Sequence, residues 1–133
     1  MPRMLNASKG TVVAEELAVA RSFRSRFRGL MLRKALADDA GLLIEPSASV
    51  HTAFMRFPID VIFLDRDLNV VKVAENLRPY RLAFSKGHSC LELAAGGARR
   101  TAIEQGDMLV VDDQTGTTTI EHNFSAGVID KRD

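Results

Sequence analysis

The residues best suited to chemistry lie in one short segment, positions 50–65 (VHTAFMRFPIDVIFLD). Within ten positions this segment contains His51, Thr52, Met55, Arg56 and Asp60. Histidine titrates near neutral pH, and arginine binds carboxylate or phosphate groups. The segment therefore predicts a polar binding pocket. A structural role is the alternative, because Arg56 and Asp60 flank the bend at Pro58 and could pair across it, as buried charges usually do.

Glu92 completes the candidate pocket, because it interrupts the apolar segment 90–94 (CLELA). Side chains alternate between the two faces of a strand, so Glu92 shares a face with Cys90. The carboxylate of Glu92 then either faces solvent or is buried beside a partner such as Arg56 or His51. The position of this strand in the sheet decides between the two interpretations.

The residue pattern gives little support to metal or cofactor chemistry. Cys90 is the only cysteine, which excludes an internal disulfide and every zinc motif built on paired cysteines. None of the three histidines lies four residues from another. The sequence also lacks a Gly-x-Ser-x-Gly nucleophile motif and a phosphate-binding glycine loop. We therefore expect no metal and no cofactor.

A basic segment at residues 21–36 (RSFRSRFRGLMLRKAL) predicts an amphipathic helix. It carries six basic residues and no acidic ones, and Arg21, Arg24 and Arg28 fall on one side of the helical projection. These three arginines predict a surface that binds an anion or an acidic partner. Alternatively, their stems cover the edge of the core and only the guanidinium groups reach water.

The elements that must position these residues are mainly short strands separated by turn residues. Strands are predicted at 11–13, 41–45, 50–54, 59–64, 70–74, 89–95, 108–111 and 117–120, and a short helix at 98–103. Glu15 and Glu16 indicate a turn or a strand edge, and residues 79–87 are expected to be irregular. The predicted fold class is mainly β (α+β): a compact, partly closed antiparallel β-barrel of seven to eight short strands with one or two packed helices. Closure would remove exposed strand edges.

The chain has 133 residues, enough for one domain and few for two. Residues 1–9 are predicted to be a flexible N-terminus, residues 10–124 a single β-rich domain and residues 125–133 a polar tail. No apolar run approaches the ~18 residues of a membrane helix, and residues 1–10 lack the apolar region of a signal peptide. We therefore expect a cytoplasmic protein, or a periplasmic or exported one if the N-terminus was trimmed.

The charges are polarised along the chain although they nearly cancel. The formal net charge is +1, yet residues 1–36 hold eight basic and two acidic residues, and residues 37–133 hold ten and fifteen. The near balance and the absence of tryptophan disfavour nucleic acid as a partner. The uneven distribution of charge along the chain still permits an acidic partner that binds the basic helix.

Five motifs follow one another along residues 10–112: RGLM at 28–31, GLLI at 41–44, HTAFMRFPIDVIFLD at 51–65, LELAAG at 91–96 and GD at 106–107. In content and order they resemble the domain-of-unknown-function 192 family of small bacterial and archaeal proteins. The positions that match the family's motifs are Gly29, Leu30, Met31, Phe54, Met55, Asp60, Asp65, Leu91, Glu92, Gly96, Gly106 and Asp107. The resemblance implies a compact β-rich domain with a helix that carries the Gly-Leu-Met segment, and it implies no reaction. Some relatives carry a cysteine where this chain has Ser47 or Ser49, which weakens any thiol or metal hypothesis.

The leading hypothesis is a non-catalytic ligand-binding or protein-interaction domain. Its pocket would be lined by the six candidate residues His51, Thr52, Met55, Arg56, Asp60 and Glu92. Its ligand would be a small anion or a peptide. The first alternative is a small hydrolase or transferase in which His51 works with Asp60 or Glu92 as an acid/base pair. The second is an accessory protein that recruits an acidic partner through the arginines of the basic helix. The sequence makes no prediction of the oligomeric state.

Overall fold

A computed structural model of the chain describes residues 2–21, 36–46, 49–51, 57–78 and 82–113. In these ranges the chain forms ten strands and one short helix. The strands are β1 (Arg3–Asn6), β2 (Thr11–Ala14), β3 (Glu16–Ala20), β4 (Ala40–Ile44), β5 (Ser49–His51), β6 (Ile59–Leu64), β7 (Val70–Leu77), β8 (Leu82–Phe84), β9 (Ser89–Ala94) and β10 (Leu109–Asp112). The helix is α2 (Gly97–Arg100). The fold is therefore mainly β, as predicted.

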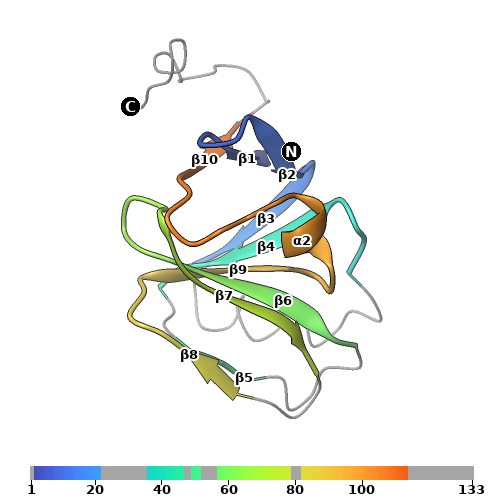
Figure 1. Ribbon diagram of the computed structural model, residues 1–133, viewed down its shortest axis with the longest axis vertical. Coiled ribbons are helices and arrows are strands. Elements are labelled where there is room, and N and C mark those ends of the chain that lie inside the picture. Colours follow the sequence, from blue (N-terminus) through green and yellow to red (C-terminus); the bar gives the residue numbers. More distant parts are fainter. Residues whose placement is uncertain (1, 22–35, 47–48, 52–56, 79–81, 114–133) are drawn as a thin grey trace.

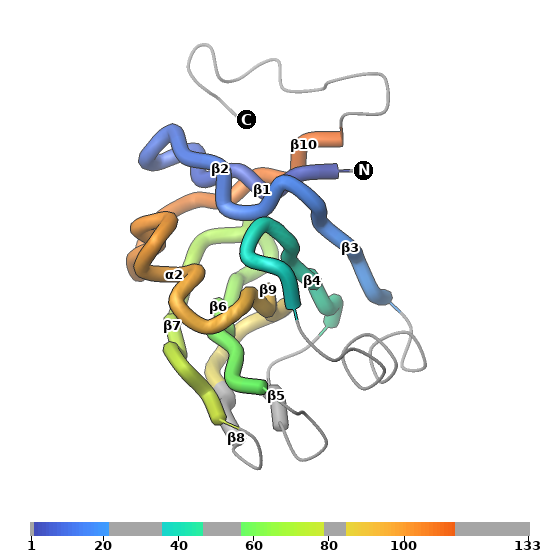
Figure 2. Tube along the Cα trace, turned by 90° about the vertical axis from the view of Figure 1, so that its right-hand side faces the viewer, coloured from blue at the N-terminus to red at the C-terminus, as the bar shows by residue number. Residues whose placement is uncertain are grey.

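Two sheets and a two-stranded ribbon make up the described fold (Figure 1). One sheet has three strands in the order β10-β1-β2, the other has five in the order β3-β4-β9-β6-β7, and β5 pairs with β8. Figures 1 and 2 place the three-stranded sheet at one end of the molecule and the β5–β8 ribbon at the other. One face of the five-stranded sheet is thus turned toward the three-stranded sheet and the opposite face toward the ribbon.

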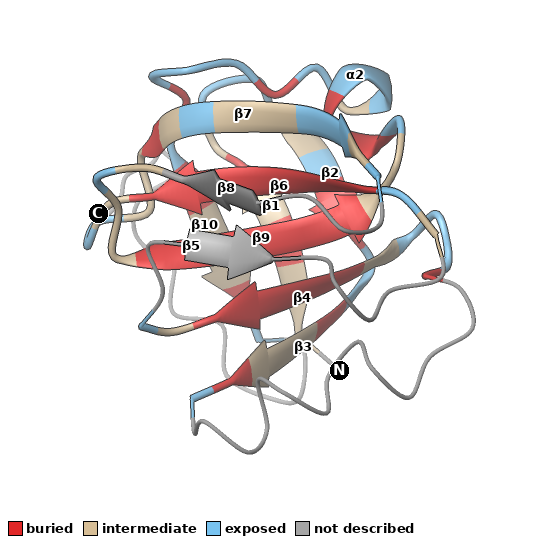
Figure 3. Ribbon diagram, turned by 90° about the horizontal axis from the view of Figure 1, so that it is seen from below, coloured by how far each residue is buried: buried red, intermediate tan, exposed pale blue. Residues whose placement is uncertain are grey.

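Each face of the five-stranded sheet carries its own apolar cluster. The first core lies between the two sheets, and its members include Met4, Val13, Leu43, Ile62, Leu91 and Leu93. The second core covers the opposite face, and its members include Leu42, Ile44, Val61, Phe63 and Cys90. All six residues of β6 are buried, because both faces of this strand are covered (Figure 3). This explains why the sequence of β6 is almost continuously apolar.

The predicted barrel closure and the purely antiparallel pairing are not found. In the described ranges, the edge strands β3 and β7 of the five-stranded sheet pair only with β4 and β6, so this sheet is open. β3 and β4 run parallel to each other. A parallel pair needs a crossover connection instead of a hairpin, and residues 21–39 supply that connection. Alternation along single strands could not reveal this topology.

Most predicted elements are present. Seven of the predicted strands correspond to β2, β4, β5, β6, β7, β9 and β10, and the helix predicted at 98–103 corresponds to α2. β3 was missed because its first residue, Glu16, indicated a turn or an edge, and β8 lies in the stretch expected to be irregular. Apart from Arg21 and Leu36, the predicted helix at 21–36 lies outside the described residues. The predicted strand at 117–120 and the tail at 125–133 lie outside them as well.

The segment expected to be a flexible N-terminus contributes a strand to the fold. β1 is the central strand of the three-stranded sheet and pairs with both β10 and β2. Its side chains alternate, since Met4 and Asn6 are fully buried while Arg3 and Leu5 are half-buried. An ion pair of 2.8 Å between Arg3 Nη2 and Asp112 Oδ2 joins β1 to the end of β10. Burial of one face and this ion pair hold the segment in place.

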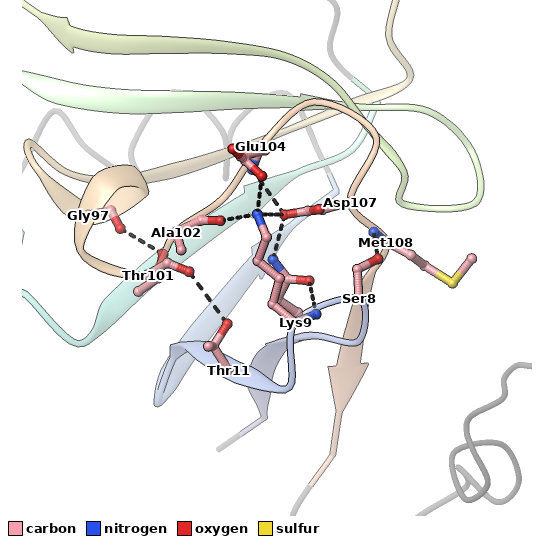
Figure 4. Close-up of polar contacts among 10 residues, drawn as sticks. Ser8, Lys9, Thr11, Gly97, Thr101, Ala102, Glu104, Asp107 and Met108 are labelled. Atoms are coloured by element: carbon pink, nitrogen blue, oxygen red, sulfur yellow. Dashed lines mark hydrogen bonds and ion pairs between the residues drawn. The ribbon is translucent and has the colours of Figure 1, made fainter.

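A polar network joins the end of β1 to the loop that precedes β10 (Figure 4). Asn6 Nδ2 donates to Asp107 Oδ2 at 2.9 Å, and the Lys9 ammonium lies 2.7 Å from Glu104 Oε1 and 3.0 Å from Asp107 Oδ2. The hydrogen bond to Glu104 raises the pKa of Lys9. Burial disfavours the ionised form of Asp107, but hydrogen bonds from Asn6 and Lys9 outweigh it and lower the pKa of Asp107. The network therefore contains a charged Lys9 and a charged Asp107 at neutral pH.

Replacing Asn6 with alanine is expected to lower the free energy of unfolding by about 2 kcal/mol, because two polar groups at this buried position each lose a hydrogen bond. The groups concerned are the Asp107 carboxylate and the Lys9 backbone N–H. Urea denaturation at pH 7 measures the change. The control is Asn69→Ala, which removes a hydrogen bond to Asp65 in a partly exposed turn, and it is expected to cost less than about 1 kcal/mol. Equal losses in the two variants would contradict a special role for the network.

Candidate functional site

Asp60 and Glu92, the two acidic residues of the predicted pocket, lie on neighbouring strands but on opposite faces of the five-stranded sheet. In the pairing of β6 with β9, Asp60 lies opposite Leu93, and Val61 lies opposite Glu92. Residues directly opposite each other share a face. Leu93 belongs to the first core and Val61 to the second. The sheet therefore separates the two carboxyl groups, and they do not line one pocket.

Asp60 connects β6 to β7 and α2 through hydrogen bonds, on the face of the five-stranded sheet that carries the first core. The residue is fully buried. Its Oδ1 atom accepts a hydrogen bond from the backbone N–H of Asn76 at 2.8 Å. Its Oδ2 atom accepts from the backbone N–H groups of Gly96 at 3.1 Å and Ala98 at 2.9 Å. These bonds join β6 to the end of β7 and to the start of α2, and they occupy both oxygens of the carboxyl group.

A shallow depression of about 570 Å³ opens beside Asp60. Its rim includes Glu75, Asn76, Arg99 and Arg100. Arg99 lies 3.8 Å from the carboxylate of Glu75, and the Arg100 guanidinium donates to the Asp38 carbonyl at 2.8 Å. No residue pattern predicts this depression, apart from the two glycines, Gly96 and Gly97, that follow β9 in the sequence. Its charged rim is already engaged in these contacts.

Glu92 lies on β9, the middle strand of the five-stranded sheet, within the second core. Only 2% of the residue is exposed, and its cross-strand neighbours Leu42 and Val61 are both buried. In the described part of the chain, its Oε1 atom has no hydrogen-bond partner. Burial raises the pKa of Glu92 to about 8, because the ionised form would lose its hydration. At pH 7 the side chain is therefore mainly a neutral carboxylic acid.

A neutral carboxylic acid in an apolar layer can form hydrogen bonds and can transfer its proton. Its O–H group can donate one hydrogen bond, and its carbonyl oxygen can accept others. A group in this state can bind a polar ligand, or it can act as a general acid if a reacting atom lies within reach. The prediction that Glu92 shares a face with Cys90 is confirmed, since the cross-strand partners of both residues belong to the second core. Glu92 is also buried, which settles the choice between a solvated and a buried carboxyl group.

Of the candidate site residues that precede Asp60, only His51 is described, and only its backbone is placed. It ends β5, and the β5–β8 ribbon lies on the side of the five-stranded sheet that carries Glu92 (Figures 1 and 3). Thr52, Met55 and Arg56 lie outside the described residues. A pocket shared by these side chains and Glu92 therefore stays a prediction.

Of the predicted arginine surface, only Arg21 is described. Its side chain is exposed, and its Nε atom donates to Glu45 Oε1 at 3.1 Å. Exposed ion pairs of this kind contribute little to stability. Arg24 and Arg28 lie outside the described residues, so the binding surface that they would form with Arg21 also stays a prediction.

Three further features can be stated for the described ranges of the chain. They contain no group of three or more histidine, cysteine, aspartate or glutamate side chains that could hold a metal ion. The thiol of Cys90 is fully buried in the second core. The helical structure in these ranges has neither the length nor the apolar character of a membrane-spanning helix.

The two sheets and Glu92 define a class of small β-rich domain with a buried carboxyl group at the centre of its larger sheet. The chain belongs to the DUF192 (UPF0127) family, whose model, described as an uncharacterized ACR, matches residues 4–111. The resemblance drawn from the sequence motifs is thereby confirmed.

Relatives and solved structures agree with this assignment. A UPF0127 protein of Pyrococcus furiosus is 38% identical over 111 residues, which cover 80% of this chain and 95% of the relative. A crystal structure from Sinorhizobium meliloti 1021, provisionally described as a transcription regulator, has 27% identity and a TM-score of 0.70 and covers 83% of this chain and 91% of that chain. A protein of unknown function from Novosphingobium aromaticivorans has 28% identity and a TM-score of 0.70, with coverages of 83% and 84%. None of these descriptions names a reaction.

Proposed function

We propose that the protein is a non-catalytic ligand-binding domain whose site lies on the second-core face of the five-stranded sheet, around Glu92. The observation that carries this proposal is the buried Glu92 carboxyl group, whose Oε1 atom has no partner in the described part of the chain. A buried polar group without a hydrogen bond costs about 1 to 3 kcal/mol. A ligand that supplies the missing hydrogen-bond partner would remove this cost when it binds.

The surroundings of Glu92 support a site that is apolar with few polar groups, as small-molecule sites commonly are. Leu42 and Val61 form apolar walls on either side of the carboxyl group. The β5–β8 ribbon lies on the same side of the sheet. Arg56, which is predicted to bind anions, follows His51 by five positions in the sequence. Because Glu92 is almost fully buried, a ligand must displace the side chains that cover it.

The position of Asp60 favours binding over catalysis. An acid/base pair must converge on one reacting group, and Asp60 lies on the opposite face with both oxygens engaged by backbone donors. A hydrolase or transferase would then rest on His51 and Glu92 alone. The members of a catalytic pair are commonly oriented by hydrogen bonds, and none to the Glu92 Oε1 atom is found among the described residues.

The description of the Sinorhizobium meliloti protein suggests nucleic acid as another ligand for this chain. DNA affinity depends on Lys and Arg side chains that neutralise phosphates. The described ranges hold nine basic and fourteen acidic residues, so this part of the chain favours a different ligand. We therefore keep a small ligand or a peptide as the proposed partner.

A ligand screen with two matched variants tests the proposal. Compounds that stabilise the protein in a thermal-shift screen are expected to lose binding in Glu92→Leu, because this variant removes the carboxyl group of the central strand on that face. Ser89→Ala is the control. Ser89 is also a buried polar residue of β9 whose hydroxyl has no partner among the described residues, but it pairs with Leu64 of the first core. Ligands that bind Glu92→Leu and the natural protein equally well would contradict the proposed site.

The protonation state of Glu92 can be measured directly. A carbon-13 NMR titration of the side-chain carboxyl group is expected to give a pKa of about 8, because burial disfavours the ionised form. A pKa of Glu92 below that of a free glutamate would show an ionised, paired carboxylate and would contradict a site that awaits a ligand.

A further inference from the structure

We infer that the ligand presents to Glu92 a neutral group with an N–H donor and a C=O acceptor on the same edge, as in a lactam or a primary carboxamide. This inference rests on the proposed function and adds the chemical class of the group that reaches the carboxyl. It concerns only the part of the ligand that enters the second core.

The hydrogen-bonding capacity of Glu92 leads to this class. A protonated carboxyl group carries one donor and one acceptor oxygen side by side. The buried Glu92 side chain lies between Leu42 and Val61, which offer neither, and its Oε1 atom has no partner among the described residues. A lactam or carboxamide edge has the complementary pair of groups. The two would form a ring of two hydrogen bonds, which satisfies the donor and the acceptor of both partners. An ordinary trans peptide group does not match, because its N–H and C=O point in opposite directions.

A charged group fits these surroundings less well. An ammonium group has three donors, while the cross-strand neighbours of Glu92, Leu42 and Val61, provide no side-chain acceptor. Two donors would then be buried without partners, in addition to the desolvation of the charge. A carboxylate would receive a single hydrogen bond from Glu92 and would likewise lose its hydration. A neutral donor–acceptor edge avoids both costs.

Four small probes of similar size distinguish these classes. Piperidin-2-one carries the lactam edge, propionamide carries the primary carboxamide, piperidine is a cation at pH 7, and cyclohexanone has an acceptor only. Each is titrated into the isotope-labelled full chain, and amide signals of Leu42, Val61 and Cys90 report binding at the second-core face. We expect the lactam or the carboxamide to shift these signals, and piperidine and cyclohexanone to leave them unchanged at the same concentrations.

Two variants of Glu92 test whether the carboxyl group itself makes the contact. Glu92→Gln keeps a neutral donor and acceptor side by side, and we expect it to bind the responding probe within about threefold of the natural protein. Glu92→Leu removes both groups, and we expect binding weaker by about tenfold or more, since two hydrogen bonds are lost. Amide signals that match the natural protein elsewhere show that each variant is folded.

The outcomes separate this inference from the proposed function. A response to piperidine that disappears in Glu92→Gln would show that Glu92 binds as an anion, which overturns the inferred class and leaves the site in place. Equal binding of the lactam by Glu92→Leu and the natural protein would overturn both the inferred class and the proposed site, because the carboxyl group would then make no contact with the ligand. No response of the reporter signals to any of the four probes would overturn both the inferred class and the proposed site.

Discussion

Replacing Asp60 with asparagine is expected to lower the free energy of unfolding by about 3 kcal/mol, although the two side chains have nearly the same shape. The carboxylate accepts hydrogen bonds from three backbone N–H groups in a fully buried position. An asparagine has one acceptor oxygen, so its amide nitrogen must face at least one of these donors. The variant therefore loses charged hydrogen bonds and also leaves a buried N–H without a partner.

The matched control for this prediction is Asp65→Asn. Asp65 also accepts three hydrogen bonds, from the backbones of Asp67 and Asn69 and from the Asn69 side chain, but in a turn open to solvent. Water replaces lost partners there, and we expect a loss below about 1 kcal/mol. Urea denaturation measures both values, and faster hydrogen exchange at Ala98 in Asp60→Asn would localise the effect. A loss no greater than that of the control would show that Asp60 does not hold α2 in place.

The stability of the natural protein is expected to fall as the pH rises from about 4.5 to about 8, because of Glu92. Below this range the carboxyl group is protonated in both the folded and the unfolded chain. Within it, the unfolded chain ionises while the folded chain retains the proton, so each pH unit costs roughly 1.4 kcal/mol. Above it both states are ionised and the penalty is constant. The full effect is roughly 4 to 5 kcal/mol.

Glu92→Gln is expected to remove this fall, because glutamine does not titrate. Its free energy of unfolding should match that of the natural protein near pH 5 and exceed it by several kcal/mol at pH 9. Ser89→Ala, which replaces a residue of the same strand that does not titrate, is the control and should keep the pH profile of the natural protein. The measurement is a series of urea denaturations between pH 4 and pH 9. Parallel profiles for the natural protein and Glu92→Gln would show that Glu92 titrates alike in both states.

Local patterns predicted the strands well and their arrangement poorly. The apolar run of β6 and the alternation of β9 identify two strands without reference to any neighbour. The parallel pairing of β3 with β4 depends on contacts between distant parts of the chain, and Glu16 at its first position gave a local signal for a turn. β1 was missed for the same reason, since its order comes from pairing with β10 at the other end of the described chain.

Local sequence patterns are limited in the same way for the two acidic residues of the candidate site, Asp60 and Glu92. The sequence places Asp60 and Glu92 each within an apolar strand, and both are indeed buried. Their separation by the sheet follows from the register in which Val61, and not Asp60, lies opposite Glu92. A shift of one residue would have placed the two carboxyl groups on one face. Register is fixed by tertiary packing, so a single sequence could suggest the pair of residues but not their opposite orientations.

The pairing of β1 with β10 has a consequence for the order in which the protein folds. Arg3 lies opposite Asp112, so the three-stranded sheet is completed by residues 109 positions apart in the chain. Contacts of such long range are formed late, because a long loop must be closed before they are gained. During synthesis, β1 leaves the ribosome first and lacks one of its two neighbours until β10 has followed. We expect the three-stranded sheet to form after the hairpin of β6 and β7, and the loss of either β1 or β10 to abolish the same sheet.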